Sequence, residues 1–244
     1  MKRDDAVIDG DVVARVQRIA AAALARDLDA QGWSVQRDLL TPPECDDIAG
    51  LYDQDAGFRS RVVMARHGFG RGEYRYFSYP LPTLIQRMRT ALYPTLAPIA
   101  NQWHERMGLA TRFPATHAAF IAQCAAAGQS RPTPLLLRYG AGDYNCLHQD
   151  LYGEQVFPLQ VAVLLSAPGA DFSGGEFVLT EQRPRMQTRA SVVPLTKGDA
   201  VVFAVNSRPV RGSRGTYRVN LRHGVSRVHG GLRHTAGIIF HDAA

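Results

Sequence analysis

The sequence predicts an α+β fold in which helices from the N-terminal half pack against an antiparallel β-barrel or jelly roll. The chain has 244 residues, 45% of them hydrophobic, which is enough to bury the core of one large domain. Apolar residues recur at helical spacing in much of residues 1–130. From residue 131, short β-branched runs alternate with clusters of Gly, Pro, Asp and Asn. We therefore expect a helical region, 1–130, and a β-rich core, 131–244, that fold as one unit.

Three N-terminal stretches have the apolar spacing of helices: residues 11–29, 81–108 and 114–127. A Gln-Gly pair ends the first, and the following WSVQRDLL has the composition of a short strand. A fourth helix is predicted at 41–52. Its first residues, Thr-Pro-Pro-Glu, combine a capping threonine with a proline in the first turn and a glutamate three residues after the cap.

Residues 57–80 have a different composition, because RHGFGRGEYRYFSYP mixes glycine, arginine and aromatic residues. We expect a hairpin or a mobile loop here, with turns at Gly68, Gly70 and Gly72. The glycines do not form a phosphate-binding loop, since no Lys-Ser/Thr pair follows them and the strand-to-helix setting is missing. A flexible lid is the expected role.

The C-terminal half contains short runs that are typical of strands and are separated by turn residues. In chain order they are PTPLLLRY, FPLQVAVLLS, GGEFVLT, SVVPL, DAVVFAV, YRVNLRHGVSRV and RHTAGIIF. Short strands at this spacing favour an antiparallel barrel or jelly roll.

The composition limits the cellular location and the binding partners that we expect for the chain. The formal net charge is +6, and all basic residues except Lys2 and Lys197 are arginines. Such a surface attracts nucleic acid, anionic metabolites or acidic protein segments, although an arginine-rich solvated surface explains it equally well. Three scattered cysteines without a CxxC pair indicate a reducing, cytoplasmic location. No apolar run is long enough to span a membrane, and the N-terminus lacks the apolar core of a signal peptide.

The stretch DYNCLHQD, residues 143–150, is the strongest candidate for a functional site. On a strand, His148 and Asp150 project from one face and can bind one ion together, and Tyr144 faces the same side as a weaker pocket candidate. An imidazole and a carboxylate suit iron(II), manganese or zinc, and a third ligand is needed. Among the other histidines, His223 is the best placed, because YRVNLRHGVSRV has the composition of a late strand of the barrel.

Arg233 stands ten residues after His223, across a turn that contains His229-Gly230-Gly231. A buried arginine at this place can pair with a carboxylate through two hydrogen bonds. With a two-residue turn, Arg233 would face away from His223. We expect a three-residue loop, in which Arg233 pairs with Arg227 and shares the face of His223.

This order of residues resembles the Fe(II)- and 2-oxoglutarate-dependent dioxygenases, in which a His-x-Asp pair precedes a distal histidine and an arginine. The corresponding residues are His148, Asp150, His223 and Arg233, and the resemblance covers roughly residues 131–244. A His-x-Asp pair alone occurs often by chance, whereas all of these elements in this order are specific.

Three further motifs are similar to those of the same family. Tyr139 resembles the tyrosine that family members place against the 2-oxoglutarate carboxylate. Ser173-Gly174-Gly175 and Lys197-Gly198-Asp199 resemble the SGG and KGD turns of the family. The phrase RHGVSRVHGG-x-RHT-x-GIIFHD is similar to a group of bacterial proteins linked with oxidative repair of alkylated DNA, and prolyl hydroxylases share a similar motif order.

The resemblance implies a double-stranded β-helix, or jelly roll, that binds Fe(II) and uses 2-oxoglutarate and O₂ as co-substrates. It implies that His148, Asp150 and His223 are metal ligands, and that Arg233 anchors 2-oxoglutarate with help from Tyr139. Decarboxylation of 2-oxoglutarate to succinate would then accompany hydroxylation or oxidative dealkylation of the primary substrate.

Two arginine-rich stretches suggest alkylated nucleic acid as the substrate. Residues 66–79 mix arginines with aromatic side chains, and residues 207–218 carry Arg208, Arg211, Arg214 and Arg218. An ordinary solvated loop explains the first stretch as well. Hydroxylation of a protein, of the prolyl type, or of a small molecule remains an alternative. A metal-binding, cupin-like module without catalysis is the alternative outside enzymes.

Overall fold

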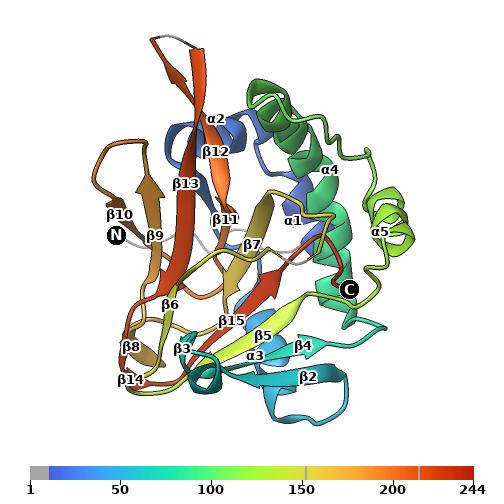
Figure 1. The fold of residues 1–244 in the computed structure, drawn as a ribbon. Coiled ribbons are helices and arrows are strands. Elements are labelled where there is room, and N and C mark those ends of the chain that lie inside the picture. Colours follow the sequence, from blue (N-terminus) through green and yellow to red (C-terminus); the bar gives the residue numbers. More distant parts are fainter. Residues whose placement is uncertain (1–10, 152, 214) are drawn as a thin grey trace.

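Two antiparallel sheets form the body of the protein in a computed structural model that describes residues 11–151, 153–213 and 215–244 (Figure 1). The seven-stranded sheet has the order β1 (Trp33–Gln36), β11 (Ala200–Ala204), β7 (Leu159–Leu164), β15 (Arg233–Ile238), β5 (Leu135–Tyr139), β4 (Glu73–Phe77) and β2 (Phe58–Val63). The second sheet has the order β10 (Arg189–Val193), β9 (Phe177–Gln182), β13 (Gly215–Val225), β6 (Tyr144–His148) and β3 (Gly70–Arg71), with β12 (Ser207–Gly212) paired to β13. A short pair joins β14 (Val228–Gly231) to β8 (Phe172–Gly174).

Five α-helices come from the N-terminal half: α1 (Val12–Gln17), α2 (Ala21–Gln31), α3 (Pro42–Gly50), α4 (Thr83–Arg106) and α5 (His117–Ala126). Short 3₁₀ turns follow at Leu51–Asp53 and Met64–Arg66. Helices α2, α3 and α4 contact strands β1, β11 and β15, so they cover the seven-stranded sheet (Figure 1). The expected combination of antiparallel strands and N-terminal helices is confirmed. None of the described helices is both long and apolar enough to cross a membrane.

The single helix expected at 11–29 is wrong, because the chain breaks between α1 and α2 at residues 18–20. No proline or glycine stands at the break. Helix α1 packs against α4, whereas α2 packs against β1 and β11, and one straight helix cannot follow both partners. Arg15 reinforces the break, since its buried side chain donates to the carbonyl of Leu39 at 2.7 Å and pairs with Glu44.

The predicted start of α3 is confirmed by a capping box. The Thr41 hydroxyl accepts from the backbone N–H of Glu44, and the Glu44 carboxylate accepts from the backbone N–H of Thr41 at 2.8 Å. Both bonds satisfy N–H groups that an isolated helix end leaves free. Gly32 ends α2 with a φ of 83°, a left-handed conformation that favours glycine.

Residues 57–80 form the expected hairpin, because β2 pairs with β4. Strand β4 then pairs with β5, so the hairpin extends the edge of the seven-stranded sheet. Between the two arms, β3 crosses to the other sheet and pairs with β6. Residues 11–130 therefore supply strands to both sheets as well as the helices.

The C-terminal segment is held by a buried arginine from α4. Arg89 donates to the carbonyls of Ile239, Phe240 and His241 at 2.8 to 3.1 Å and pairs with Asp242 at 2.7 Å. Both charged side chains are fully buried, at 0% and 2% exposure. A buried charge is stable only when its partners are complete, so this network fixes the chain that leaves β15.

We expect Asp242→Ala to lower the free energy of unfolding by about 3 kcal/mol or more, because it leaves the Arg89 charge buried without its carboxylate. Urea denaturation of the intact chain measures this change. The control is Asp46→Ala, which removes an exposed partner of Lys197 and should cost no more than about 1 kcal/mol. Equal effects of the two substitutions would contradict the structural role assigned to Asp242.

Candidate active site

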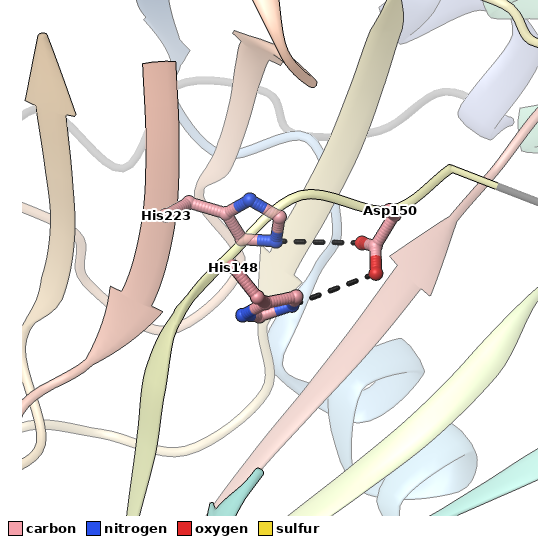
Figure 2. Close-up of side chains that lie close together, drawn as sticks. All are labelled: His148, Asp150 and His223. Carbon is pink, nitrogen blue, oxygen red and sulfur yellow. Dashed lines mark ion pairs between the residues drawn. The ribbon is translucent and has the colours of Figure 1, made fainter. Parts of the chain in front are cut away.

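Three metal-capable side chains meet between the two sheets. His148 ends β6, Asp150 follows two residues later, and His223 lies on β13 as the pairing partner of His148. The Nε2 atoms of His148 and His223 lie 3.5 and 3.4 Å from the two carboxylate oxygens of Asp150 (Figure 2). Each of the three residues offers one ligand atom, and these three atoms all lie within 4.8 Å of one another. The structure therefore brings together the three residues that the sequence predicted.

The three side chains shift one another's protonation in different directions: at His148, burial lowers the pKa of the imidazole, but the hydrogen bond with Asp150 outweighs it and raises the pKa above its usual value. Burial raises the pKa of Asp150, but hydrogen bonds from His148 and His223 outweigh it and hold the pKa well below its usual range. Burial lowers the pKa of His223, which favours the neutral imidazole. His148 Nδ1 lies 2.8 Å from the carbonyl of Cys146, so a proton held on Nδ1 would let Nε2, which contacts Asp150, bind an ion instead. Two imidazoles and one carboxylate are the donor set of a non-haem iron(II) site with open positions.

A β-bulge in β6 decides which side chains face this site. His223 pairs with His148 and Val225 pairs with Asn145, so three steps on β6 oppose two on β13. The extra residue changes the alternation, and both Asn145 and His148 line the cavity. Tyr144, expected on the side of His148, does not line the cavity.

The hairpin predicted between His223 and Arg233 is wrong. After β13, the chain forms β14, which pairs with β8, and Arg233 begins β15 in the seven-stranded sheet. Its pairing partner is Tyr139 and not Arg227. Arg233 still lines the same cavity as His223, because the two sheets face each other across it. The prediction from loop length failed because β14 pairs with β8 and not with a strand that contains Arg233.

Arg233 is a buried cation without an acidic partner. Its side chain is 1% exposed, and burial lowers its pKa to about 10. One guanidinium nitrogen donates to the Thr235 hydroxyl at 2.6 Å, whereas Nε is buried without a hydrogen-bond partner. No carboxylate among the described residues lies within 4 Å of it. A buried charge in this state is costly, so the site is suited to an anionic ligand.

The cavity that joins these residues has a volume of about 350 Å³, within the range of small-molecule sites. Tyr139 is fully buried in its wall, where the hydroxyl accepts from Asn145 Nδ2 at 3.3 Å. The sequence prediction missed Asn145, Gln160 and Thr235, which also line the cavity. Only Thr235 had a signal in the sequence, because it stands two residues after Arg233 on a strand and so shares its face.

Of the two arginine-rich stretches, only one reaches this cavity. Gly68, Phe69 and Tyr74 line it, whereas no described residue of 207–218 does. Arg208 is instead buried against Glu181, and Arg218 donates to the carbonyl of Met107 at 2.9 Å. Arg214 lies outside the described residues. The described arginines of 207–218 therefore do not support nucleic-acid binding at this cavity.

Comparisons with known proteins agree with this geometry. Residues 72–243 match a family described as an oxygenase catalysing oxidative methylation of damaged DNA. An uncharacterized protein of Mycobacterium tuberculosis is 50% identical over 168 residues, which cover 69% of this chain and 72% of the relative.

Solved structures share the fold at low identity. A Pseudomonas putida prolyl-4-hydroxylase has a TM-score of 0.52 at 15% identity, over 92% of this chain and 99% of that one. A Burkholderia pseudomallei oxidoreductase of the 2OG-Fe(II) oxygenase family has a TM-score of 0.55 at 16% identity, over 92% and 93%. A Trichoplax adhaerens prolyl hydroxylase in complex with a peptide has a TM-score of 0.55 at 12% identity, over 94% and 91%.

The fold and the site define an Fe(II)- and 2-oxoglutarate-dependent oxygenase. The chain belongs to the family of oxygenases described as catalysing oxidative methylation of damaged DNA, whose match covers residues 72–243. The enzyme class predicted from the sequence, with Fe(II), 2-oxoglutarate and O₂, is confirmed. The alternative of a cupin-like module without catalysis is thereby set aside.

We expect Arg233→Met to raise the free energy of unfolding of the ligand-free protein by about 1 kcal/mol or more, because it removes an uncompensated buried charge. Urea denaturation without 2-oxoglutarate measures the effect. Arg89→Met is the matched control, and it should destabilise the protein because it leaves the Asp242 carboxylate buried without its arginine partner. A loss of stability in Arg233→Met as large as in the control would show that the protein itself satisfies this guanidinium.

Proposed function

We propose that His148, Asp150 and His223 hold iron(II) and that Arg233 binds the distal carboxylate of 2-oxoglutarate. Iron(II), when bound, supplies the activation of O₂ that lets one oxygen atom enter the substrate while the other enters succinate. The buried Nε of Arg233, which has no hydrogen-bond partner, supports the role of this side chain as the anchor, and the Thr235 hydroxyl orients the guanidinium. Tyr139 is proposed to assist, since it faces Arg233 across the β5–β15 pair.

Aromatic side chains beside His223 support the proposed metal site. The ring centroids of Phe177 and Phe203 lie 5.9 and 4.6 Å from the ring centroid of His223. The two phenylalanines exclude water from that side of the triad. A dry wall strengthens the charge interactions inside the site.

We also infer that residues 131–244 form a double-stranded β-helix, or jelly roll, as the catalytic core. Four of their strands, β5, β15, β7 and β11, are adjacent in one sheet, and β6, β13, β9 and β10 are adjacent in the other. Residues 1–130 supply the helices and extra strands around this core. The cytoplasmic location predicted from the cysteines remains a proposal, and the described thiols of Cys45, Cys124 and Cys146 are free.

As the primary substrate we propose alkylated nucleic acid, which would be hydroxylated or oxidatively dealkylated. The family description links the chain to damaged DNA. Phe69, 47% exposed, lies at the cavity within the segment 64–71, and Leu147, 44% exposed, lies there from β6. Arg66 and Arg71 flank Phe69, are exposed and have no ion pair with another described residue. Exposed aromatic and arginine side chains together suit base stacking and phosphate contact.

Hydroxylation of a protein or of a small molecule remains the alternative for the same chemistry. Consumption of 2-oxoglutarate that is stimulated by a proline-containing peptide, and not by a methylated strand, would favour it.

The proposed roles of the metal ligands and of Arg233 predict different defects in two variants. In an anaerobic titration of the Fe(II)-loaded protein with 2-oxoglutarate, we expect a visible charge-transfer band in the wild type. His148→Ala should abolish the band, because a ligand is lost. Arg233→Met should keep iron but weaken 2-oxoglutarate binding about 100-fold, since one buried charge pair is removed.

Matched controls are His229→Ala and Arg222→Met, two exposed residues that do not line the cavity. A 2-oxoglutarate titration of His148→Ala or Arg233→Met that equals that of the wild type would contradict the role proposed for that residue.

The substrate assignment predicts salt-dependent binding of a short single strand. The double variant Arg66→Ala, Arg71→Ala should reduce the slope of log affinity against log salt by about 1.4, because each lost phosphate contact contributes about 0.7. Arg211→Ala is the control, since Arg211 pairs with Thr216 beside the turn of the β12–β13 hairpin and does not line the cavity. Figure 1 shows that this hairpin extends away from β3 and β14. Absence of binding at low salt would remove nucleic acid as the substrate.

A further inference from the structure

The half-buried ring of Tyr144 and the exposed side chain of Arg227 make contact outside the cavity. Tyr144 begins β6, and its neighbour Asn145 lines the cavity whereas Tyr144 does not. Because successive side chains of a strand project from opposite faces, the Tyr144 ring lies on the outer face of the second sheet. The guanidinium carbon of Arg227 lies 5.6 Å from the centroid of this ring.

A third side chain, Arg71, joins this pair from β3. Arg71 is the pairing partner of Tyr144, and directly opposed residues of antiparallel strands project from the same face. Strands β3, β6 and β14 meet at one end of the second sheet (Figure 1). Two exposed arginines therefore approach one tyrosine ring, Arg71 from β3 and Arg227 from the segment between β13 and β14. We call these three side chains the outer patch.

The outer patch is continuous with the mouth of the cavity. The carbonyl of Phe69, a residue that lines the cavity, accepts from the backbone N–H of Cys146 at 2.9 Å, so the segment before β3 lies directly against β6. Leu147 also lines the cavity and stands three residues from Tyr144, which is about 10 Å along β6 at ~3.3 Å per residue. An extended chain that leaves the mouth along β6 therefore reaches the outer patch over the surface.

The charge of the outer patch is positive, because neither of its arginines has an ion pair with a carboxylate among the described residues. The carboxylates beside it have partners of their own. Asp143, which precedes Tyr144, accepts from the backbone N–H of Gly140 at 2.8 Å. Glu176 accepts from the hydroxyl of Ser226. Exposed arginines next to an aromatic ring fit a ligand that offers both negative charge and flat rings, which a single strand of nucleic acid does at every nucleotide.

We propose that the outer patch binds the part of a single-stranded nucleic acid that flanks the nucleotide in the cavity. This surface rests on the proposed nucleic-acid function and extends it beyond the cavity. A flanking base stacks against the pair of Tyr144 and Arg227, and the two arginines of the outer patch contact the neighbouring phosphates. Stacking and phosphate contacts tolerate any base, so the outer patch contributes affinity and sets the position of the strand without selecting its sequence.

Fluorescence anisotropy of a short labelled single strand, titrated with the metal-free full chain, measures this surface without catalysis. Tyr144→Leu should weaken binding about tenfold, because stacking is lost, and leave the slope of log affinity against log salt unchanged. Tyr144→Phe keeps the ring and should bind as the wild type does. Arg227→Ala should reduce the slope by about 0.7, because one phosphate contact is lost. Arg26→Ala, at an exposed position of α2, is the matched control.

A strand of the same length in which abasic sites replace the bases separates stacking from charge. It keeps every phosphate, so Arg227→Ala should reduce its salt slope as well. Tyr144→Leu should bind it as the wild type does, since no base is present to stack. Equal weakening of both strands by Tyr144→Leu would contradict the stacking role, and so would a loss of affinity in Tyr144→Phe equal to that in Tyr144→Leu.

The results distinguish failure of the outer patch from failure of the proposed function. If the wild type binds the strand, and both Tyr144→Leu and Arg227→Ala match it in affinity and slope, the outer patch is overturned and the nucleic-acid function stands. An acidic peptide of the same charge is the competing probe. If it binds more tightly than the strand and loses affinity in these two variants, the surface belongs to a protein partner and the proposal fails. If the wild type binds no strand at low salt, the nucleic-acid function and the outer patch fail together.

Discussion

The pairing of β6 with β13 is the constraint on which the rest of the site depends. It sets His148 opposite His223, and the bulge between Asn145 and His148 turns both of these β6 side chains toward the cavity. A regular ladder would have alternated them to opposite faces. The bulge gives up regular pairing in exchange for this orientation, as is common near active sites. Asp150, just beyond the strand, then reaches both imidazoles.

The buried arginines show how partner completeness separates structural from functional charges. Arg89 and Arg208 are both almost fully buried, and each has a carboxylate and backbone carbonyls as partners. Arg233 is equally buried but has the Thr235 hydroxyl and no carboxylate among the described residues. Since a buried charge needs an opposite charge, we propose that the missing one belongs to a ligand.

Local rules in the sequence succeeded where the interaction partners are close along the chain. The capping box at Thr41 spans a few residues, so the pattern alone specifies it. His148 and Asp150 meet as predicted, although the strand ends at His148 and Asp150 follows it. Prediction failed where the partner is distant. The helix at 11–29 divides because its halves pack on different elements, and the strand of Arg233 pairs with β5 and β7 instead of β13.

The sequence by itself indicated the oxygenase class, because the order of two imidazoles, a carboxylate and an arginine carries the resemblance to that family. It also indicated the antiparallel strands, since their composition and turn residues are local properties. Only the tertiary structure decided that Arg233 approaches from the opposite sheet, that residues 66–71 and not 207–218 flank the cavity, and that Gln160 faces it unpaired. Strand order and register arise from contacts between residues far apart in the chain, and no local pattern encodes those contacts.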